Sequence, residues 1–225
     1  ADQADWCFAL VRTDTSVKHK GISFLLIDMK SEGVEARPIV LISGSTHFCE
    51  VFFNDVKVPK GDLVGELNNG WTIAKRLLQF ERSSLSEVKT DVTPLAPVAH
   101  DMLGTDEAGR IADPELRGRI VHNAMRHAAY LQTVRRFNEE ARSGGPNNGV
   151  STLKNLWSGI VQRRAELLVE VLGAEGLGWS GEAYPAQSRE ATRALLHSKA
   201  FSIYGGSYEI QNNITAKRSL GLPDK

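Results

Sequence analysis

The hydrophobic positions follow two different periods along the 225 residues. In the first part, short runs of β-forming residues alternate with turn residues such as Gly33, Gly44 and Pro59. Strands this short and closely spaced favour an antiparallel meander, or a piece of a barrel or sandwich. The pattern predicts four of them, at Trp6–Val11, Gly21–Ile27, Val34–Pro38 and Val51–Val58.

After Gly70 the apolar residues recur at helical spacing, beginning with Trp71, Ala74 and Leu77. A long helix is predicted from Leu116 to Ala141, with Asp113 as its cap and proline in its first turn. Its apolar positions are Ile120, Val121, Ala124, Ala128, Leu131 and Val134.

A further helix is predicted from Ser151 to Leu172, ended by Gly173. Its core side is predicted to be Leu156, Trp157, Ile160, Leu167, Leu168 and Val171. Two more helices, Ser188–Ser202 and Glu209–Ser219, flank a Gly-Gly turn, whereas residues 89–112 read as a long loop or a broken helix end.

These elements predict an α+β chain with two domains. Residues 1–66 would be the C-terminal part of an antiparallel β domain, and residues 67–225 an up-down bundle of the four-helix type. A four-stranded sheet whose edges and second face lack cover is unusual. We therefore expect that the chain begins inside a domain, with the rest removed or on another polypeptide.

Charge and composition exclude several classes of function. Lys plus Arg equals Asp plus Glu at 27 each, which disfavours a nucleic-acid binder. The longest apolar run, Ile22–Ile27, is far shorter than the roughly 20 residues of a membrane span. Neither Cys7 nor Cys49 has a histidine at metal-ligand spacing, so no metal site is expected. Without a signal peptide, we expect a cytoplasmic protein with reduced cysteines.

Several local strings are more specific than the pattern of elements. They occur in the order Phe48–Pro59 (FCEVFFNDVKVP), Leu63–Glu66 with Asn69-Gly70-Trp71, Phe80-Glu81-Arg82, Ile203–Ile214 (IYGGSYEIQNNI) and Leu220–Pro223. Together they resemble the acyl-CoA dehydrogenase family, from the last strand of its β domain to the end of its C-terminal helical domain.

The resemblance implies an FAD-dependent enzyme that oxidises an acyl-CoA, passes electrons to an electron-transfer flavoprotein, and forms a homotetramer or heterotetramer. The pattern looks like a bacterial branch that acts on fatty acids, steroid side chains and other bulky acids. Two departures matter. The family's Arg-x-x-Phe-Gly string is missing, and Leu172–Gly178 (LGAEGLG) replaces its His-Gly-Gly-x-Gly.

The resemblance also assigns roles to residues. Many members carry the catalytic base directly after the signature tyrosine, where this chain has Gly205. Others carry it before the arginine of the first bundle helix, which implies Glu81 as the base here. Gly205 would then offer its N–H to the thioester carbonyl. Arg82 and Tyr204 would contact the substrate, and the cofactor-binding residues would be Ser207, Glu209, Gly176 and Gly178.

Each of these residues also has a purely structural interpretation. Glu81 could pair with Arg82 or Lys75 on a helix surface, and Arg82 could face solvent. Tyr204 could be a half-buried aromatic residue at a helix end. Ser207 with Glu209 could be a helix cap and first turn. Gly176 and Gly178 could simply form a turn.

Two alternatives to a dehydrogenase remain open. The chain could be a non-catalytic or half-site partner subunit of a heteromeric enzyme, as Gly205 and the missing arginine string suggest. It could also be an acyl-CoA oxidase, which carries out the same half-reaction with oxygen as acceptor. In either case we expect this piece alone to be inactive and to bind flavin poorly.

Overall fold

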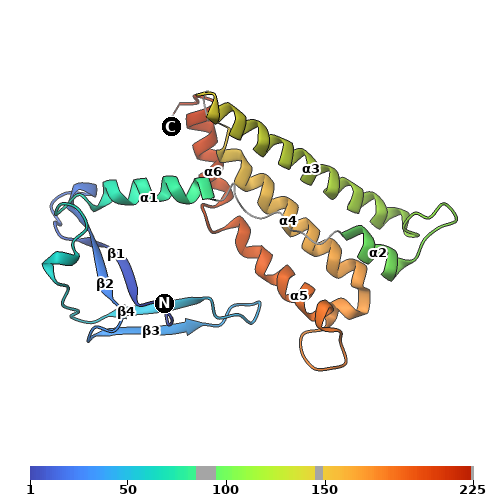
Figure 1. The fold of residues 1–225 in the computed structure, drawn as a ribbon, viewed down its shortest axis with the longest axis horizontal. Coiled ribbons are helices and arrows are strands. Elements are labelled where there is room, and N and C mark those ends of the chain that lie inside the picture. The colour runs from blue at the N-terminus through green and yellow to red at the C-terminus, as the bar shows by residue number, and fades with distance from the viewer. Residues whose placement is uncertain (85–94, 145–148, 224–225) are drawn as a thin grey trace. The chain divides into compact units, whose positions relative to one another are not determined.

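The fold is known from a computed structural model that describes residues 1–84, 95–144 and 149–223 (Figure 1), with the side chains of residues 79–84 outside that description. Contacts within the chain divide it into two compact units, Ala1–Glu87 and Val88–Lys225. The first unit holds the four strands, α1 and two short 3-10 helices, η1 (His19–Gly21) and η2 (Lys60–Asp62), and the second holds the other described helices. The domain boundary expected after residue 66 stays a prediction.

Four strands form the first unit as two antiparallel hairpins. β1 (Trp6–Arg12) pairs with β2 (Ile22–Asp28), and β3 (Val34–Ile39) pairs with β4 (Phe48–Phe53). The antiparallel pairing is confirmed, but the single meander is wrong, because the described strands form two separate two-stranded sheets. The fourth strand also lies earlier than predicted. It ends at Phe53 because Asp55 has a left-handed backbone with φ 52°.

Helix α1 (Gly70–Ser84) begins directly against β2. A Cβ atom at Gly70 would lie 2.4 Å from the carbonyl carbon of Ser23, so only glycine allows this approach. Just before the helix, the Asn68 N–H donates to Ser23 Oγ of β2 at 2.8 Å. The start of α1 is therefore fixed against β2 by this hydrogen bond and by the close backbone contact at Gly70.

Helices make up the second unit, with α4 (Ser151–Leu172) lying between α3 and α5 (Figure 1). The other elements are α2 (Leu95–Leu103), α3 (Pro114–Arg142), η4 (Gly173–Leu177), α5 (Ala186–Ser198), η5 (Lys199–Ser202), α6 (Tyr208–Ile214) and η6 (Thr215–Ser219). Helical units of this kind bury the faces that neighbouring helices share. Here α4 packs against α2, α3, α5 and α6.

The predicted helix limits are largely confirmed. The Asp113 carboxylate accepts hydrogen bonds from Glu115 N and Leu116 N, both at 2.9 Å, and α4 has the predicted bounds. Helix α2 contradicts the prediction of a loop or broken helix end over residues 89–112. Pro97 is compatible with it because it sits in the first turn, where a backbone N–H has no partner to lose.

The core lies along α4. Leu167 is fully buried and packs with residues of α2 and α3, and a second cluster gathers Tyr130, Phe137, Leu153 and Ile160. One prediction about the core is wrong, because Leu156 is 39% exposed. Four of the apolar residues noted in the sequence of α3 are exposed as well. These four are Val121, Ala124, Ala128 and Leu131.

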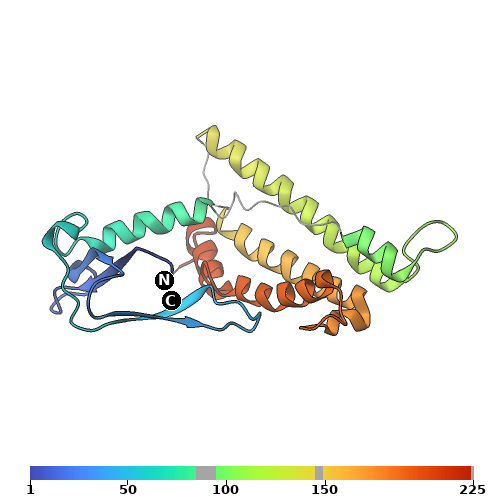
Figure 2. The same ribbon diagram turned by 60° about the horizontal axis from the view of Figure 1, so that its bottom comes forward.

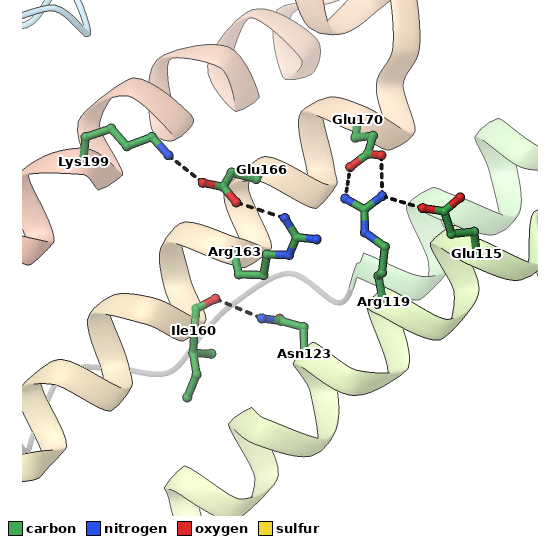
Figure 3. A network of polar contacts seen from close by, with 8 residues as sticks. All are labelled: Glu115, Arg119, Asn123, Ile160, Arg163, Glu166, Glu170 and Lys199. Carbon is green, nitrogen blue, oxygen red and sulfur yellow. Dashed lines mark hydrogen bonds and ion pairs between the residues drawn. The ribbon is translucent and has the colours of Figure 1, made fainter.

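Polar contacts also join α3 to α4 (Figure 3). Arg119 binds Glu170 through both guanidinium Nη atoms, and Asn123 Nδ2 donates to the Ile160 carbonyl at 3.1 Å. Within α4, the Glu166 carboxylate accepts hydrogen bonds from Arg163 of the same helix at 3.2 Å and from Lys199 of η5 at 2.7 Å. Because Asn123 is buried, its amide must be hydrogen-bonded, which fixes the register of the two helices.

Truncating Leu167 should destabilise the protein far more than truncating an exposed leucine of the same helix. We expect Leu167→Ala to lower the free energy of unfolding by about 2 to 5 kcal/mol, because a cavity remains in the core. Leu156→Ala is the matched control and should cost less than about 1 kcal/mol. Denaturant unfolding followed by helical circular dichroism measures both. Equal losses would contradict this description of the core.

Candidate active site

A turn between η5 and α6 holds three of the residues singled out in the sequence, Tyr204, Gly205 and Ser207. Gly205 and Gly206 both have left-handed backbones, with φ 68° and 96°. A Cβ atom at Gly206 would lie 2.7 Å from Gln211 Nε2, so a side chain there would clash as well as strain the backbone. The glycine pair is thus required by the turn itself.

Both glycine carbonyls are bound by side chains of this chain. The Gly205 carbonyl accepts from Gln211 Nε2 at 2.8 Å, and the Gly206 carbonyl accepts from Lys154 Nζ at 2.5 Å. The described peptide bonds are all trans, so each N–H points away from the carbonyl of its own peptide. The N–H groups of Gly206 and Ser207 therefore point away from Gln211 and Lys154.

Helix α4 holds this turn through polar side chains about one helical turn apart. Ser158 Oγ contacts the Phe201 carbonyl at 2.7 Å, and Gln162 Nε2 donates to the Ser198 carbonyl at 2.9 Å. Asn155 bonds to Asn212 in α6, and its carbonyl accepts from Tyr208 Oη. None of these residues was predicted as functional from the sequence. Their signal is the spacing of Lys154, Ser158 and Gln162, which places them on one side of the helix.

Ser207 and Glu209 act as a helix start, as their structural interpretation predicted. Ser207 is the N-cap of α6, and its Oγ accepts from Ile210 N at a long 3.5 Å. Hydrogen bonding from the Ser207 hydroxyl is the main cause that holds the pKa of Glu209 below its usual value, with a smaller contribution from Lys154. Glu209 is exposed and so remains an ionised acceptor at neutral pH.

Tyr204 stands at the edge of the turn. Its ring is 44% exposed and meets Phe201 edge-on, with 5.5 Å between ring centroids. Partial burial raises the pKa of its phenol, so the hydroxyl stays protonated at neutral pH. The neighbouring Ile203 is 70% exposed. The turn therefore combines backbone donors with an exposed apolar rim.

The remaining predicted residues belong to other elements of the chain. Glu81 and Arg82 fall within the range of α1, but their side chains lie outside the described residues, and α1 belongs to the other compact unit. The predicted proximity of Glu81 to Gly205 therefore stays a prediction.

Gly176 and Gly178 lie where η4 follows α4, and each is packed against this chain. Added Cβ atoms would lie 2.6 Å from the Val169 carbonyl oxygen and 2.6 Å from Tyr184 Cγ, respectively. In addition, the Gly176 carbonyl accepts from Thr192 Oγ1 at 2.8 Å. Internal packing is thus a sufficient reason for both glycines, and their role in cofactor binding stays a prediction.

A separate hollow of about 550 Å³ lies in the first unit, where α1 begins. Its lining includes Lys20, Lys75 and the His19 ring, which stacks on Trp71 with 4.7 Å between centroids. Nothing in the sequence pattern predicts a site at these residues. Among all the residues that the structure describes, no group of three His, Cys, Asp or Glu side chains could hold a metal ion. None of the described helices is long and apolar enough to cross a membrane.

The sequence and the fold of this chain both resemble those of known proteins. Residues 68–220 match the model of the acyl-CoA dehydrogenase C-terminal domain. The acyl-CoA dehydrogenase IpdE1 of Mycolicibacterium smegmatis is 36% identical over 229 residues, which cover 99% of this chain and 55% of that protein. The chain thus spans about half the length of this curated relative.

Solved structures share the fold. A structure described as the Tcur3481-Tcur3483 steroid ACAD aligns with a TM-score of 0.84 and 20% identity, over 100% of this chain and 58% of the other. The ChsE4-ChsE5 complex of Mycobacterium tuberculosis aligns with a TM-score of 0.79 and 23% identity, over 100% and 59%. Because the family model matches residues 68–220 and a relative is 36% identical over 99% of the chain, this chain belongs to the acyl-CoA dehydrogenase family.

Proposed function

We propose that this chain supplies part of the active site of an FAD-dependent acyl-CoA dehydrogenase, which introduces a Cα–Cβ double bond into an acyl-CoA thioester. The turn at Tyr204–Ser207 carries the proposal. Gln211 and Lys154 hold the Gly205 and Gly206 carbonyls, which orients the N–H groups of Gly206 and Ser207 beside an exposed apolar rim. The Gly205 N–H of the preceding peptide would join them as a donor to the thioester carbonyl. Fixed donors of this kind stabilise the negative charge that develops on a thioester carbonyl when the α-proton leaves.

Proton removal needs a carboxylate, and Gly205 has none. Since the family resemblance places the base on the first bundle helix, we assign it to Glu81. Its carboxylate takes the α-proton, and the electrons of that C–H bond form the double bond as hydride leaves Cβ. When bound, FAD would accept the hydride at N5. The base would need partial desolvation to raise its pKa towards neutral pH.

The residues at the start of α6 fit the adenosine end of FAD in their chemistry. Glu209 offers an exposed, ionised carboxylate, which accepts hydrogen bonds from ribose hydroxyls, and Ser207 offers a hydroxyl beside it. Gly176 and Gly178 would approach the flavin of a neighbouring subunit only through their backbones, because their Cβ sides are filled. Arg82 and Tyr204 would contact the acyl-CoA.

The proposed substrate is a bulky acyl-CoA such as a steroid side chain, and the proposed acceptor is electron-transfer flavoprotein. Similarity to a structure described as a steroid ACAD supports the choice of a steroid side chain as substrate. We further propose a heterotetramer, since the Tcur3481-Tcur3483 and ChsE4-ChsE5 structures each join two different chains.

A half-site subunit without its own base is the second candidate. Gly205, which leaves the turn without a carboxylate, and the missing Arg-x-x-Phe-Gly string favour it. An oxidase differs from both in producing peroxide when an acyl-CoA is added to the aerobic enzyme.

Replacing Glu81 tests the choice between the first two candidates. In the flavin-loaded assembly, Glu81→Gln removes the base but keeps the side chain's shape, so kcat should fall about 10²- to 10⁴-fold. Flavin absorbance should be unchanged. Glu66→Gln, which removes an exposed carboxylate from the same unit, is the control and should retain activity. Full activity in Glu81→Gln would assign the base to another residue or another chain.

Removing the Lys154 ammonium tests the role of the turn. A hydrogen bond to a charged group contributes about 1.5 to 3 kcal/mol, so Lys154→Met should lower kcat/KM for an acyl-CoA about tenfold or more. The cause is a Gly206 carbonyl left without its partner. Lys199→Met removes an ammonium that binds Glu166 instead and is the matched control. Steady-state kinetics with both variants should separate them, and equal losses would exclude a special role for the turn.

A further inference from the structure

Three polar residues join the β1–β2 hairpin to the start of α1 through a closed set of hydrogen bonds. The Asn68 N–H donates to Ser23 Oγ at 2.8 Å. Thr13 Oγ1 lies 2.7 Å from Ser23 Oγ and donates to Asn68 Oδ1 at 2.5 Å. Because a hydroxyl has one proton and Thr13 gives its proton to Asn68, Ser23 must donate to Thr13. Each hydroxyl therefore donates once and accepts once, and we call these three residues the linker network.

The linker network holds Asn68 in an unusual backbone conformation. Its φ is 66°, a left-handed value that one other non-glycine residue of the described ranges shares, Asp55. Asparagine adopts this conformation more readily than most residues, but the conformation still costs free energy and persists only where neighbouring contacts determine it. Those contacts are strong here because Ser23 is fully buried, so water does not compete for its hydroxyl. The linker network thus fixes the turn that leads into α1.

Helix α1 begins two residues after Asn68 and transmits the direction of this turn. Its first residue, Gly70, lies against the Ser23 backbone, and Figures 1 and 2 show one continuous helix from there to Ser84. An α-helix rises about 1.5 Å per residue, so residue 81 lies about 16 Å along the axis from Gly70. A tilt of about 10° at the start would move that residue by about 3 Å. Small changes in the linker network are therefore amplified along α1.

We propose that Thr13, Ser23 and Asn68 position the catalytic base by setting the direction of the helix that carries Glu81. This inference rests on the proposed function, which assigns the base to Glu81. Abstraction of the α-proton needs the base and the carbon in near-attack contact, and a misplacement of about 1 Å can lower the rate about 10²-fold. The three residues are positioning residues, because they act through α1 and not on the reacting atoms.

Thr13 offers the cleanest test, because valine matches its shape and because, unlike Asn68, it does not line the hollow beside α1. Thr13→Val removes the hydroxyl and opens the linker network, whereas Thr13→Ser keeps the hydroxyl and is the matched control. In the flavin-loaded assembly, Thr13→Val should lower kcat for an acyl-CoA about 10- to 100-fold, with KM and flavin absorbance unchanged. Thr13→Ser should retain most of the wild-type kcat.

The pH profile of kcat separates positioning from a loss of folded protein. A base displaced towards solvent has a lower pKa, because water stabilises the carboxylate. It therefore stays deprotonated to lower pH, and the acidic limb of the kcat profile of Thr13→Val should move to lower pH. A smaller folded fraction would lower kcat without moving that limb.

Two further measurements distinguish failure of this inference from failure of the proposed function. Thr13→Val should not lower the residual rate of Glu81→Gln further, since no base remains to be displaced. Amide hydrogen exchange over residues 68–78 should be faster in Thr13→Val than in Thr13→Ser, whichever residue is the base. Full kcat in Thr13→Val, an unmoved acidic limb, a further loss in the double variant or unchanged exchange would each overturn the inference alone. Full kcat in Glu81→Gln would overturn the proposed base, and the inference with it.

Discussion

The two sides of α4 determine how the helical unit is built. One side is apolar and buries Leu167 and Val171 against α2 and α3. The other presents amide, hydroxyl and ammonium groups, from Gln162, Ser158 and Lys154, to backbone carbonyls at the end of α5, in η5 and in the turn before α6. Carbonyls in such a connection lack helical partners, and leaving them unpaired in a partly buried place is costly. The apolar side therefore assembles the unit, while the polar side sets the conformation of the turn at Gly205 and Gly206.

That division gives the turn a chemical property that its glycines alone would not provide. Two left-handed residues can adopt many loop conformations, and their N–H groups would then have no fixed direction. Here Gln211 and Lys154 each bind one glycine carbonyl, so the two peptide planes are oriented before any ligand arrives. Donors oriented in advance need no rearrangement as charge develops on a bound carbonyl, which is the condition for effective electrostatic stabilisation. Lys154 is thus a positioning residue in the proposed site.

Local signals in the sequence were sufficient for most of the helix limits but not for all of the packing. Asp113 and Gly173 mark helix ends because capping and chain reversal depend on single residues. Two strand pairs, α2 and the exposed side of α3 depend on tertiary contacts that periodicity does not contain. Ile120 and Val121 are both apolar neighbours, yet only Ile120 is buried. Likewise, the string around Gly205 indicated the turn, whereas Lys154 is a signal only once α4 and α6 are known to be adjacent.

Two exposed apolar surfaces of this chain differ in kind, and the difference bears on what each one binds. β1 presents large side chains, Trp6, Phe8 and Leu10, from a two-stranded hairpin that is marginal without further cover. Such a face is suited to a broad sheet or domain surface, in which aromatic rings bury much area. The outer side of α3 is narrow and centred on Ala124 and Ala128, whose small side chains allow a second helix to approach closely. The β1 face therefore suits burial of a broad apolar area, whereas the outer side of α3 suits contact with a single helix.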